Sequence, residues 1–247
     1  MTAYAHDEVV PDKQSTLAKK RQVADMFNDI AGRYDFLNRF LSAGTDRRWR
    51  KKAIAELREV HPKMILDVAT GTADVAILAF KLLHPSKIIG IDIAESMLKL
   101  GRKKIEKLRL ADKIELVAGD GETINYGPHS FDAITVAFGV RNFENLENGL
   151  SEMLRVLKPG GKISILEFSK PKAYLFKGLY NLYMKTIAPG FGKMLAKNKQ
   201  AYEYLNNSVQ AFPDRESFLE IMQKVGFTKT YFKQFSLGIC CVYCGSK

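Results

Sequence analysis

Apolar and polar residues follow each other along the chain in patterns that predict a series of strands and helices. The run from Ile65 to Asp74 opens with apolar, partly β-branched residues, turns at Gly71 and continues at helical spacing up to Leu83. It predicts a strand, a glycine turn and a helix. Such a turn lets a ligand approach the backbone, and the N–H groups of the new helix favour polar or anionic groups. The pattern therefore indicates a nucleotide site.

A second predicted strand ends at Asp92 and supports this interpretation. Asp92 lies about 20 residues beyond the turn, where a carboxylate at the tip of the second parallel strand meets a pair of ribose hydroxyls. Only Gly71 stands where a dinucleotide fingerprint has three glycines, so the turn alone is equally well explained as an ordinary structural turn. The spacing fits NAD and S-adenosylmethionine equally.

The alternation of strands and helices continues beyond Asp92. Strands are predicted at 114–117, 131–138 and 163–168, and helices at 95–108 and 146–157. The third strand leads to Asp120 and Gly121, beside the crevice where open α/β sheets bind ligands. Residues 171–210 hold aromatics and lysines without a strand between them, and Asp214 then caps a further predicted helix.

The chain ends with two predicted strands, at about 228–235 and 238–244, joined by a short turn at Ser236 and Leu237. A NAD-binding half would alternate strand and helix to the sheet edge. A C-terminal β-hairpin points instead to the seven-stranded methyltransferase sheet, in which one strand is antiparallel.

Helical patterns also precede the first strand. Residues 1–20 are polar and predict a flexible tail, while apolar positions from Val23 onward and a cap at Asp46 predict helices up to about Val60. These helices are either a packing layer over the sheet edge or a lid over the cofactor pocket, and both can hold. We expect one domain at 21–247, with a lid at 21–60 and a helical insertion at 171–210 that faces substrate or membrane.

Composition narrows the class of protein. With 247 residues, 46% hydrophobic and 11% aromatic, the chain is not disordered, and no apolar run approaches the ~18 residues that span a bilayer. The N-terminus has no apolar h-region, so we expect no secretory signal and a cytoplasmic protein. The net charge of +11 implies attraction to a polyanion, which is a nucleic acid, an anionic membrane or an acidic substrate.

Cysteine and histidine do not predict a metal site. All three cysteines, Cys240, Cys241 and Cys244, fall in the last predicted strand, and the latter two form a CxxC. A structural zinc site needs a second ligand pair, and none of the four histidines has ligand spacing to another. We interpret the cysteines as small buried apolar residues.

Three longer motifs carry a family resemblance. The first is Tyr34-Asp35-Phe36-Leu37-Asn38, with Ser42, Asp46 and Trp49 behind it. The second is Phe138-Gly139-Val140-Arg141-Asn142. The third is Arg155-Val156-Leu157-Lys158-Pro159-Gly160-Gly161, followed by Glu167 and Ser169. From about Val23 to its end, the chain resembles the quinone-biosynthesis C-methyltransferases, which act on demethylmenaquinone and, in some members, on a ubiquinone precursor.

The resemblance implies an α/β fold of the class I, Rossmann-like, S-adenosylmethionine-dependent methyltransferases. It implies that Thr72 touches S-adenosylmethionine, that Asp92 holds the ribose hydroxyls, and that Asp120 with Gly121 meets the adenine. The expected cofactor site also includes Asp67 and Gly71. The sequence departs from the family at Asp46, where many members carry histidine, and at Ala137, where some carry serine, so no contact is assigned to Ala137. The residue types at positions 71–74 resemble those of the menaquinone-only branch of the family.

The implied reaction is C-methylation of demethylmenaquinol to menaquinol, the last step of menaquinone biosynthesis. A ring carbon needs electron density, so a quinol hydroxyl must be at least partly ionised, which for a pKa of ~10 costs about 4 kcal/mol at pH 7. A charge-assisted hydrogen bond is worth roughly 1.5–3 kcal/mol, and Arg141 is our candidate to supply it, with Asn142 orienting Arg141 or the quinol oxygen. The alternative role of Arg141 is a salt bridge to an acid such as Glu144.

The polyprenyl tail of such a substrate stays in a membrane. Aromatics and lysines that interleave between Lys170 and Lys185 resemble an interfacial amphipathic segment, so we expect peripheral contact with an anionic inner membrane face. An ordinary helical cap with a solvated lysine face explains the same pattern. We also allow for a homodimer, because the residues leave the oligomeric state open.

Other functions stay open at this point. Bifunctional methylation of a ubiquinone precursor is the first alternative. An RNA methyltransferase would also be basic, but residues 137–140 lack the Asn/Asp-Pro-Pro-aromatic run of base-amine methylation, so we expect no nucleic-acid partner. A catalytically silent lipid- or nucleotide-binding protein would bind cofactor without methyl transfer. The C-terminal hairpin disfavours a NAD dehydrogenase.

Overall fold

The computed structural model describes residues 4–42, 44–170 and 199–247, which contain a seven-stranded sheet of order β3-β2-β1-β4-β5-β7-β6. The strands are β1 (Met64–Val68), β2 (Lys87–Asp92), β3 (Ile114–Ala118), β4 (Phe131–Ala137), β5 (Leu157–Phe168), β6 (Thr228–Phe235) and β7 (Cys240–Ser246). Within this sheet β7 pairs antiparallel with both β5 and β6, and the other pairs are parallel. The predicted sheet and its C-terminal hairpin are confirmed.

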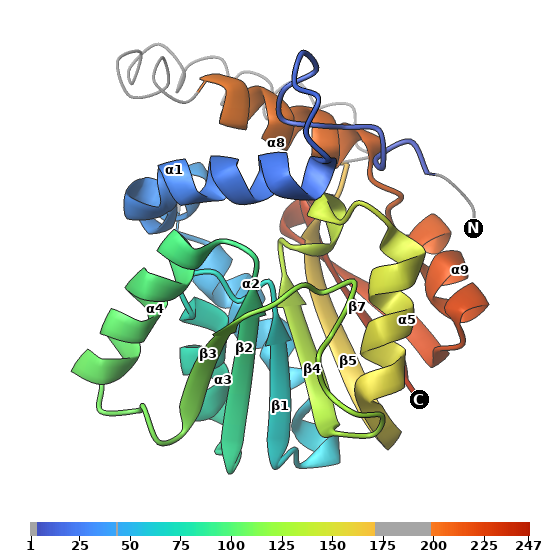
Figure 1. Ribbon diagram of the computed structural model, residues 1–247. Helices are drawn as coiled ribbons and strands as arrows, with labels where there is room; N and C mark the ends of the chain where they lie inside the picture. The colour runs from blue at the N-terminus through green and yellow to red at the C-terminus, as the bar shows by residue number, and fades with distance from the viewer. Residues whose placement is uncertain (1–3, 43, 171–198) are drawn as a thin grey trace.

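Helices cover both faces and one end of the sheet (Figure 1). The α-helices are α1 (Lys19–Leu41), α2 (Asp46–Ala55), α3 (Asp74–Leu83), α4 (Glu95–Lys107), α5 (Leu146–Val156), α8 (Lys199–Ala211) and α9 (Glu216–Val225). Short 3-10 turns are η1 (Arg58–Val60), η2 (Val140–Asn142) and η3 (Ser236–Gly238). α1 and α8 lie across the end of the sheet at which the parallel strands finish, so they cover the crevice where such sheets bind ligands.

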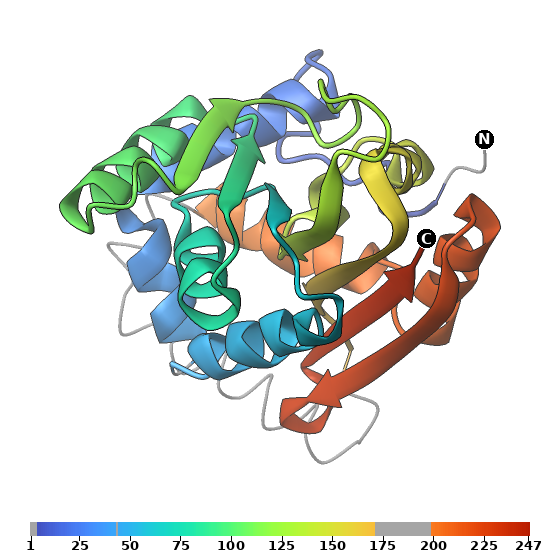
Figure 2. The same ribbon diagram turned by 90° about the horizontal axis from the view of Figure 1, so that it is seen from below.

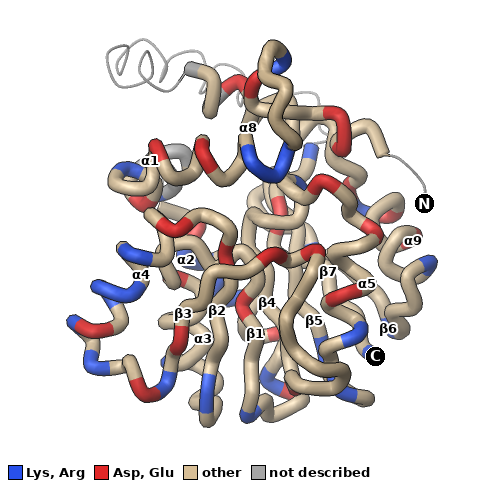
Figure 3. The backbone as a smooth tube through the Cα atoms, in the orientation of Figure 1, with Lys and Arg blue, Asp and Glu red and all other residues tan. Residues whose placement is uncertain are grey.

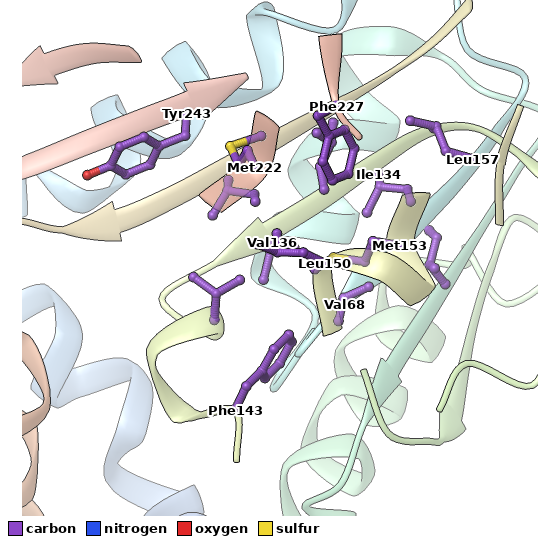
Figure 4. Close-up of a cluster of buried hydrophobic side chains, with 14 of the residues drawn as sticks. Val68, Ile134, Val136, Phe143, Leu150, Met153, Leu157, Met222, Phe227 and Tyr243 are labelled. Atoms are coloured by element: carbon purple, nitrogen blue, oxygen red, sulfur yellow. The ribbon is translucent and has the colours of Figure 1, made fainter. Parts of the chain in front are cut away.

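Side chains that alternate along the central strands build a core on each face. Leu66 and Ile134 point to one side and pack with Leu150 of α5 and Met222 of α9; Figure 4 shows this cluster. Their neighbours along the strands belong to a second cluster with α2, α3 and α4. The two cores hold the strand ends in a fixed arrangement.

Three predicted boundaries were wrong. α2 ends at Ala55, not near Val60, and a 3-10 turn follows it; Asp46 does not cap this helix but is its first residue, with Thr45 as the N-cap residue. β5 begins at Leu157, because Leu157 pairs with Phe131, and the segment read as a helix stop is an irregularity inside the strand before pairing resumes at Lys162. Asp214 does not cap α9; Arg215 is the N-cap residue, and the Asp214 carboxylate accepts the backbone N–H of Lys170 instead.

The expectation of a flexible tail at 1–20 does not fit the described residues of that segment. His6 is fully buried, with its ring 5.5 Å from the Phe212 ring, and Lys19 donates to the His6 carbonyl at 2.6 Å. The Tyr4 hydroxyl donates to Glu147. Hydrogen bonds and a ring contact therefore hold this largely polar segment against the rest of the protein. Of the predicted helical insertion at 171–210, residues 171–198 lie outside the described residues, and residues 199–210 belong to α8.

Candidate active site

A cavity lies at the carboxyl ends of the first four strands, beneath α1. Its lining comprises Lys20, Val23, Phe27, Tyr34, Val68, Ala69, Gly71, Asp92, Ile93, Met97, Gly119, Asp120, Gly121, Glu122, Ala137, Phe138, Gly139, Asn142 and Phe143. It encloses about 70 Å³, whereas pockets for organic ligands typically hold roughly 300–1,000 Å³. α1 supplies part of this lining, through Lys20, Val23, Phe27 and Tyr34.

The turn after β1 places Gly71 against Asp92. The Gly71 N–H donates to one carboxylate oxygen of Asp92 at 2.8 Å, and the Ala94 N–H donates to the other at 2.9 Å. Burial raises the pKa of Asp92 despite these bonds. A carboxylate has about four acceptor positions, so capacity remains for a ligand hydroxyl. Both predicted residues line the cavity, with Gly71 at a φ of 56° that disfavours larger residues.

Asp67 and Thr72 stand outside the cavity lining. The Asp67 carboxylate accepts the hydroxyls of Thr70 and Thr135, each at 2.6 Å, and burial raises its pKa to about 6. The Thr72 hydroxyl donates to Asp35 of α1 at 2.6 Å and accepts from Lys104 at 2.9 Å. Both side chains therefore hold the turn and α1 in place, and the structure does not bring them to the space a cofactor would fill.

Asp120 and Gly121 line the cavity after β3. A Cβ at Gly121 would stand 2.8 Å from Phe143 and 2.9 Å from Val68, so only glycine leaves this wall free. The Asp120 carboxylate is paired with Lys20 of α1 at 2.5 Å, and Lys20 lies 3.8 Å from Glu122. This pair joins α1 to the far rim of the cavity. Lys20 belongs to no recognisable sequence motif, so its place in the site could not be predicted.

Arg141 lies behind the cavity wall in η2. Its Nη1 donates to Glu167 at 2.7 Å and to the Phe138 carbonyl at 2.7 Å, and both charged side chains are almost fully buried. The alternative role of Arg141, a salt bridge to an acid, is therefore present in the structure, but the acid is Glu167 of β5 and not Glu144. Burial raises the pKa of Glu167, and the guanidinium opposes this rise. The buried Nε of Arg141 has no partner among the described residues, and Arg141 is not part of the cavity lining.

Asn142 lines the cavity beside Arg141. Its amide nitrogen donates to the Phe138 carbonyl at 3.3 Å, and its amide oxygen accepts the Tyr204 hydroxyl of α8 at 3.2 Å. The amide is therefore held from both ends, while the second hydrogen on its nitrogen stays available. Tyr204 is buried. The sequence did not point to it, because residues 171–210 contain many aromatics and lysines and no predicted strand that would place any one of them at the site.

Metal sites and membrane-spanning helices were also sought in the described residues. These residues contain no group of three or more His, Cys, Asp or Glu side chains arranged to hold a metal ion. Within the same ranges, no helix has both the length and the apolar character that crossing a membrane requires.

Comparisons with known proteins agree on one family. The model of the ubiE/COQ5 methyltransferase family matches residues 15–247. A Bacteroides fragilis protein named demethylmenaquinone methyltransferase is 46% identical over 93% of this chain and 94% of its own length. A Geobacter sulfurreducens protein named ubiquinone/menaquinone biosynthesis C-methyltransferase is 45% identical over 93% of this chain and 90% of its own.

Solved structures of low identity share the fold. The [4+2]-cyclase SpnF superposes with a TM-score of 0.65 at 15% identity and covers 92% of this chain and 96% of its own. An S-adenosylmethionine-dependent methyltransferase from Thermotoga maritima has a TM-score of 0.60 at 18% identity, with 91% of this chain and 99% of its own covered. These likenesses concern the fold alone.

Proposed function

The chain belongs to the ubiE/COQ5 methyltransferase family, and from that premise we propose that it methylates a ring carbon of demethylmenaquinol to give menaquinol. It is an S-adenosylmethionine-dependent methyltransferase. The observation that carries the choice of substrate is the 46% identity, over almost the whole chain, to a relative named for that reaction. The position of the Asp92 carboxylate at the tip of β2 supports cofactor binding and does not bear on the choice of substrate.

We assign cofactor binding to the cavity rim. Asp92 would hold the ribose hydroxyls with its remaining acceptor capacity, and Asp120 would accept from the adenine amine in a pocket that Gly121 keeps open. Gly71 lets the backbone approach the ligand. Thr72 and Asp67 would act indirectly by holding the turn. When bound, the cofactor supplies a sulfonium methyl group.

The quinol needs a cation or strong donors near the hydroxyl that ionises. Arg141 has a buried, unpartnered Nε, and Asn142 has a second amide hydrogen on the cavity wall. We propose that Asn142 contacts the developing quinolate and that the charge of Arg141 stabilises it from behind the cavity wall. Arg141 is not the base, because arginine stays protonated, and Glu167 is engaged with it. The proton therefore leaves through water at the crevice.

We propose that the protein is cytoplasmic and reaches its polyprenyl substrate by peripheral contact with an anionic membrane face, as a monomer or a homodimer. The net charge of +11 supports such contact. A second candidate is methylation of a ubiquinone precursor, which the Geobacter sulfurreducens relative favours by its name.

The test is methyl transfer from radiolabelled S-adenosylmethionine in detergent. Three acceptors are compared: reduced demethylmenaquinol, its oxidised quinone and a demethylated ubiquinone precursor. We expect transfer to the reduced naphthoquinol alone. Transfer to the benzoquinol as well would establish the second candidate. Cofactor binding without transfer to any acceptor would refute the proposed reaction.

A further inference from the structure

The tip of the β6–β7 hairpin exposes a large apolar side chain in a backbone conformation that such residues avoid. Leu237 in η3 is 64% exposed, more than the other large apolar residues that the structure describes as exposed. Its φ of 59° and ψ of 28° are left-handed, and Ser236 before it has a φ of 47°. Turns of this kind normally carry asparagine or glycine. Neither packing nor turn chemistry explains a leucine here.

The tip is held firmly at the crevice end of the sheet. The Trp49 indole donates to the Ser236 hydroxyl at 2.9 Å, and the Ser169 hydroxyl donates to the Gly238 carbonyl at 2.6 Å. Cys240, just beyond the tip, pairs with Phe168 at the end of β5. Leu237 is therefore presented to solvent by a fixed scaffold.

A row of cations lies next to this tip on α2. Figure 2 shows the hairpin beside α2, and the Lys52 amine lies 4.9 Å from the centre of the Phe235 ring. Four basic residues of α2 are exposed, and the described part of the chain offers none of them an ion pair. These residues are Arg47, Arg48, Lys51 and Lys52. We call them the basic face of α2.

An apolar cluster connects this region to the active site. Trp49 packs edge-on against Phe168, and Phe168 stacks on Phe138, which lines the cavity. Phe235 and Ile239, on either side of the tip, pack against the same cluster. A surface that met the tip would lie beside an apolar layer leading toward Arg141, whose guanidinium is 5.5 Å from the Phe168 ring.

We propose that Leu237 and the basic face of α2 form a docking surface for an anionic lipid bilayer. Leucine would enter the boundary between headgroups and acyl chains while the arginines and lysines meet lipid phosphates. Charge complementarity favours this partner, because the face carries cations without counter-charges. The inference rests on the proposed function, in which the polyprenyl tail of the substrate stays in that bilayer.

Two variants test the surface by sedimentation with vesicles made of equal parts phosphatidylglycerol and phosphatidylcholine. Leu237→Asn suits the left-handed turn and removes the apolar anchor, and we expect it to bind about tenfold more weakly. Arg48→Gln/Lys51→Gln removes two charges, and we expect a loss of about tenfold and a weaker dependence on salt. Vesicles of phosphatidylcholine alone should bind the parent protein much less.

Matched controls come from α4, along whose length Figure 3 also shows Lys and Arg. Lys103→Gln/Lys107→Gln removes the same charge from exposed positions, and Leu108→Asn removes a leucine that is 44% exposed. We expect each control to bind within about twofold of the parent protein. An equal loss in the charge control would mean attraction to net charge, and would overturn the assigned surface.

Activity and stability separate this proposal from the proposed function. With a short-tailed, water-soluble demethylmenaquinol we expect all variants to match the parent, whereas with long-tailed quinol in vesicles Leu237→Asn should lose activity in step with binding. Its melting temperature should stay equal or rise, since asparagine accepts the turn. A lower melting temperature would assign Leu237 a structural role. Parent-like vesicle binding, or self-association through this face, would refute the docking surface while leaving methyl transfer intact.

Discussion

Arg141 and Glu167 form the buried ion pair whose removal separates a structural role from a catalytic one. The perturbation is Arg141→Met, Glu167→Gln and the double variant. Nη1 of Arg141 lies 2.7 Å from Glu167, whose side chain is fully buried, so Arg141→Met strands a carboxylate away from water. Breaking such a pair typically costs about 3–5 kcal/mol.

The double variant should recover most of this stability. Glutamine is neutral and keeps an oxygen that can accept the Phe168 N–H, which donates to Glu167 at 2.8 Å. We expect the double variant to be destabilised by no more than about 2 kcal/mol. Arg21→Met is the matched control, because its pair with Asp25 is solvent-exposed and worth about 0–1 kcal/mol.

Turnover should behave differently from stability. If the guanidinium stabilises the quinolate, its loss removes roughly 1.5–3 kcal/mol from the transition state, which lowers kcat about 10- to 150-fold. This loss should persist in the double variant, because no cation remains. Urea unfolding measures the stability and methyl transfer at saturating substrates measures kcat. Recovery of kcat together with stability would refute a catalytic role for Arg141.

Three further predictions concern the cavity and the strand below it. Asp92→Asn removes the charge expected to hold the ribose, so calorimetry should show a Kd for S-adenosylmethionine raised about 10- to 100-fold, and an unchanged Kd would contradict the assignment. Lys20→Met frees Asp120 for the adenine, so we expect the Kd to fall by up to about fivefold, and a rise would show that Lys20 assists binding. The pKa of Asp67 is raised to about 6, so its contribution to stability is full below its unfolded value of 3.8 and is lost as the pH rises through 6. Asp67→Asn should make the free energy of unfolding less dependent on pH between pH 4 and 6. A pH dependence equal to that of the parent would contradict this role of Asp67.

The sheet was predictable because its signals are local and repeated. Strands such as β1 and β2 are largely apolar runs, the first followed by the turn at Gly71 and the second ending at Asp92, and the helices between them indicate parallel pairing. The hairpin followed from two β-branched and aromatic runs with a short turn. The start of β5 was missed because Pro159 and Gly160 normally interrupt regular structure, and here they form an irregularity inside the strand, between Leu157 and Lys162.

Residues of the candidate site could be predicted only where a functional side chain or a glycine lies at or just after the end of a strand. Gly71, Asp92 and Asp120 line the cavity as their positions in the sequence suggested. Side-chain direction is a tertiary property, so the sequence could not reveal that Thr72 and Asp67 turn away from the cavity. Hydrogen-bond and ion-pair partners that are far apart in the sequence could not be predicted for the same reason.

The most direct test of the account is to supply S-adenosylmethionine with a trideuterated methyl group together with reduced demethylmenaquinol, and to analyse the product by mass spectrometry after air oxidation. The account predicts a quinone that carries the trideuterated methyl on a ring carbon, because a C-methylated quinol can still be oxidised. A trideuterated methyl ether, which cannot return to a quinone, would contradict the account.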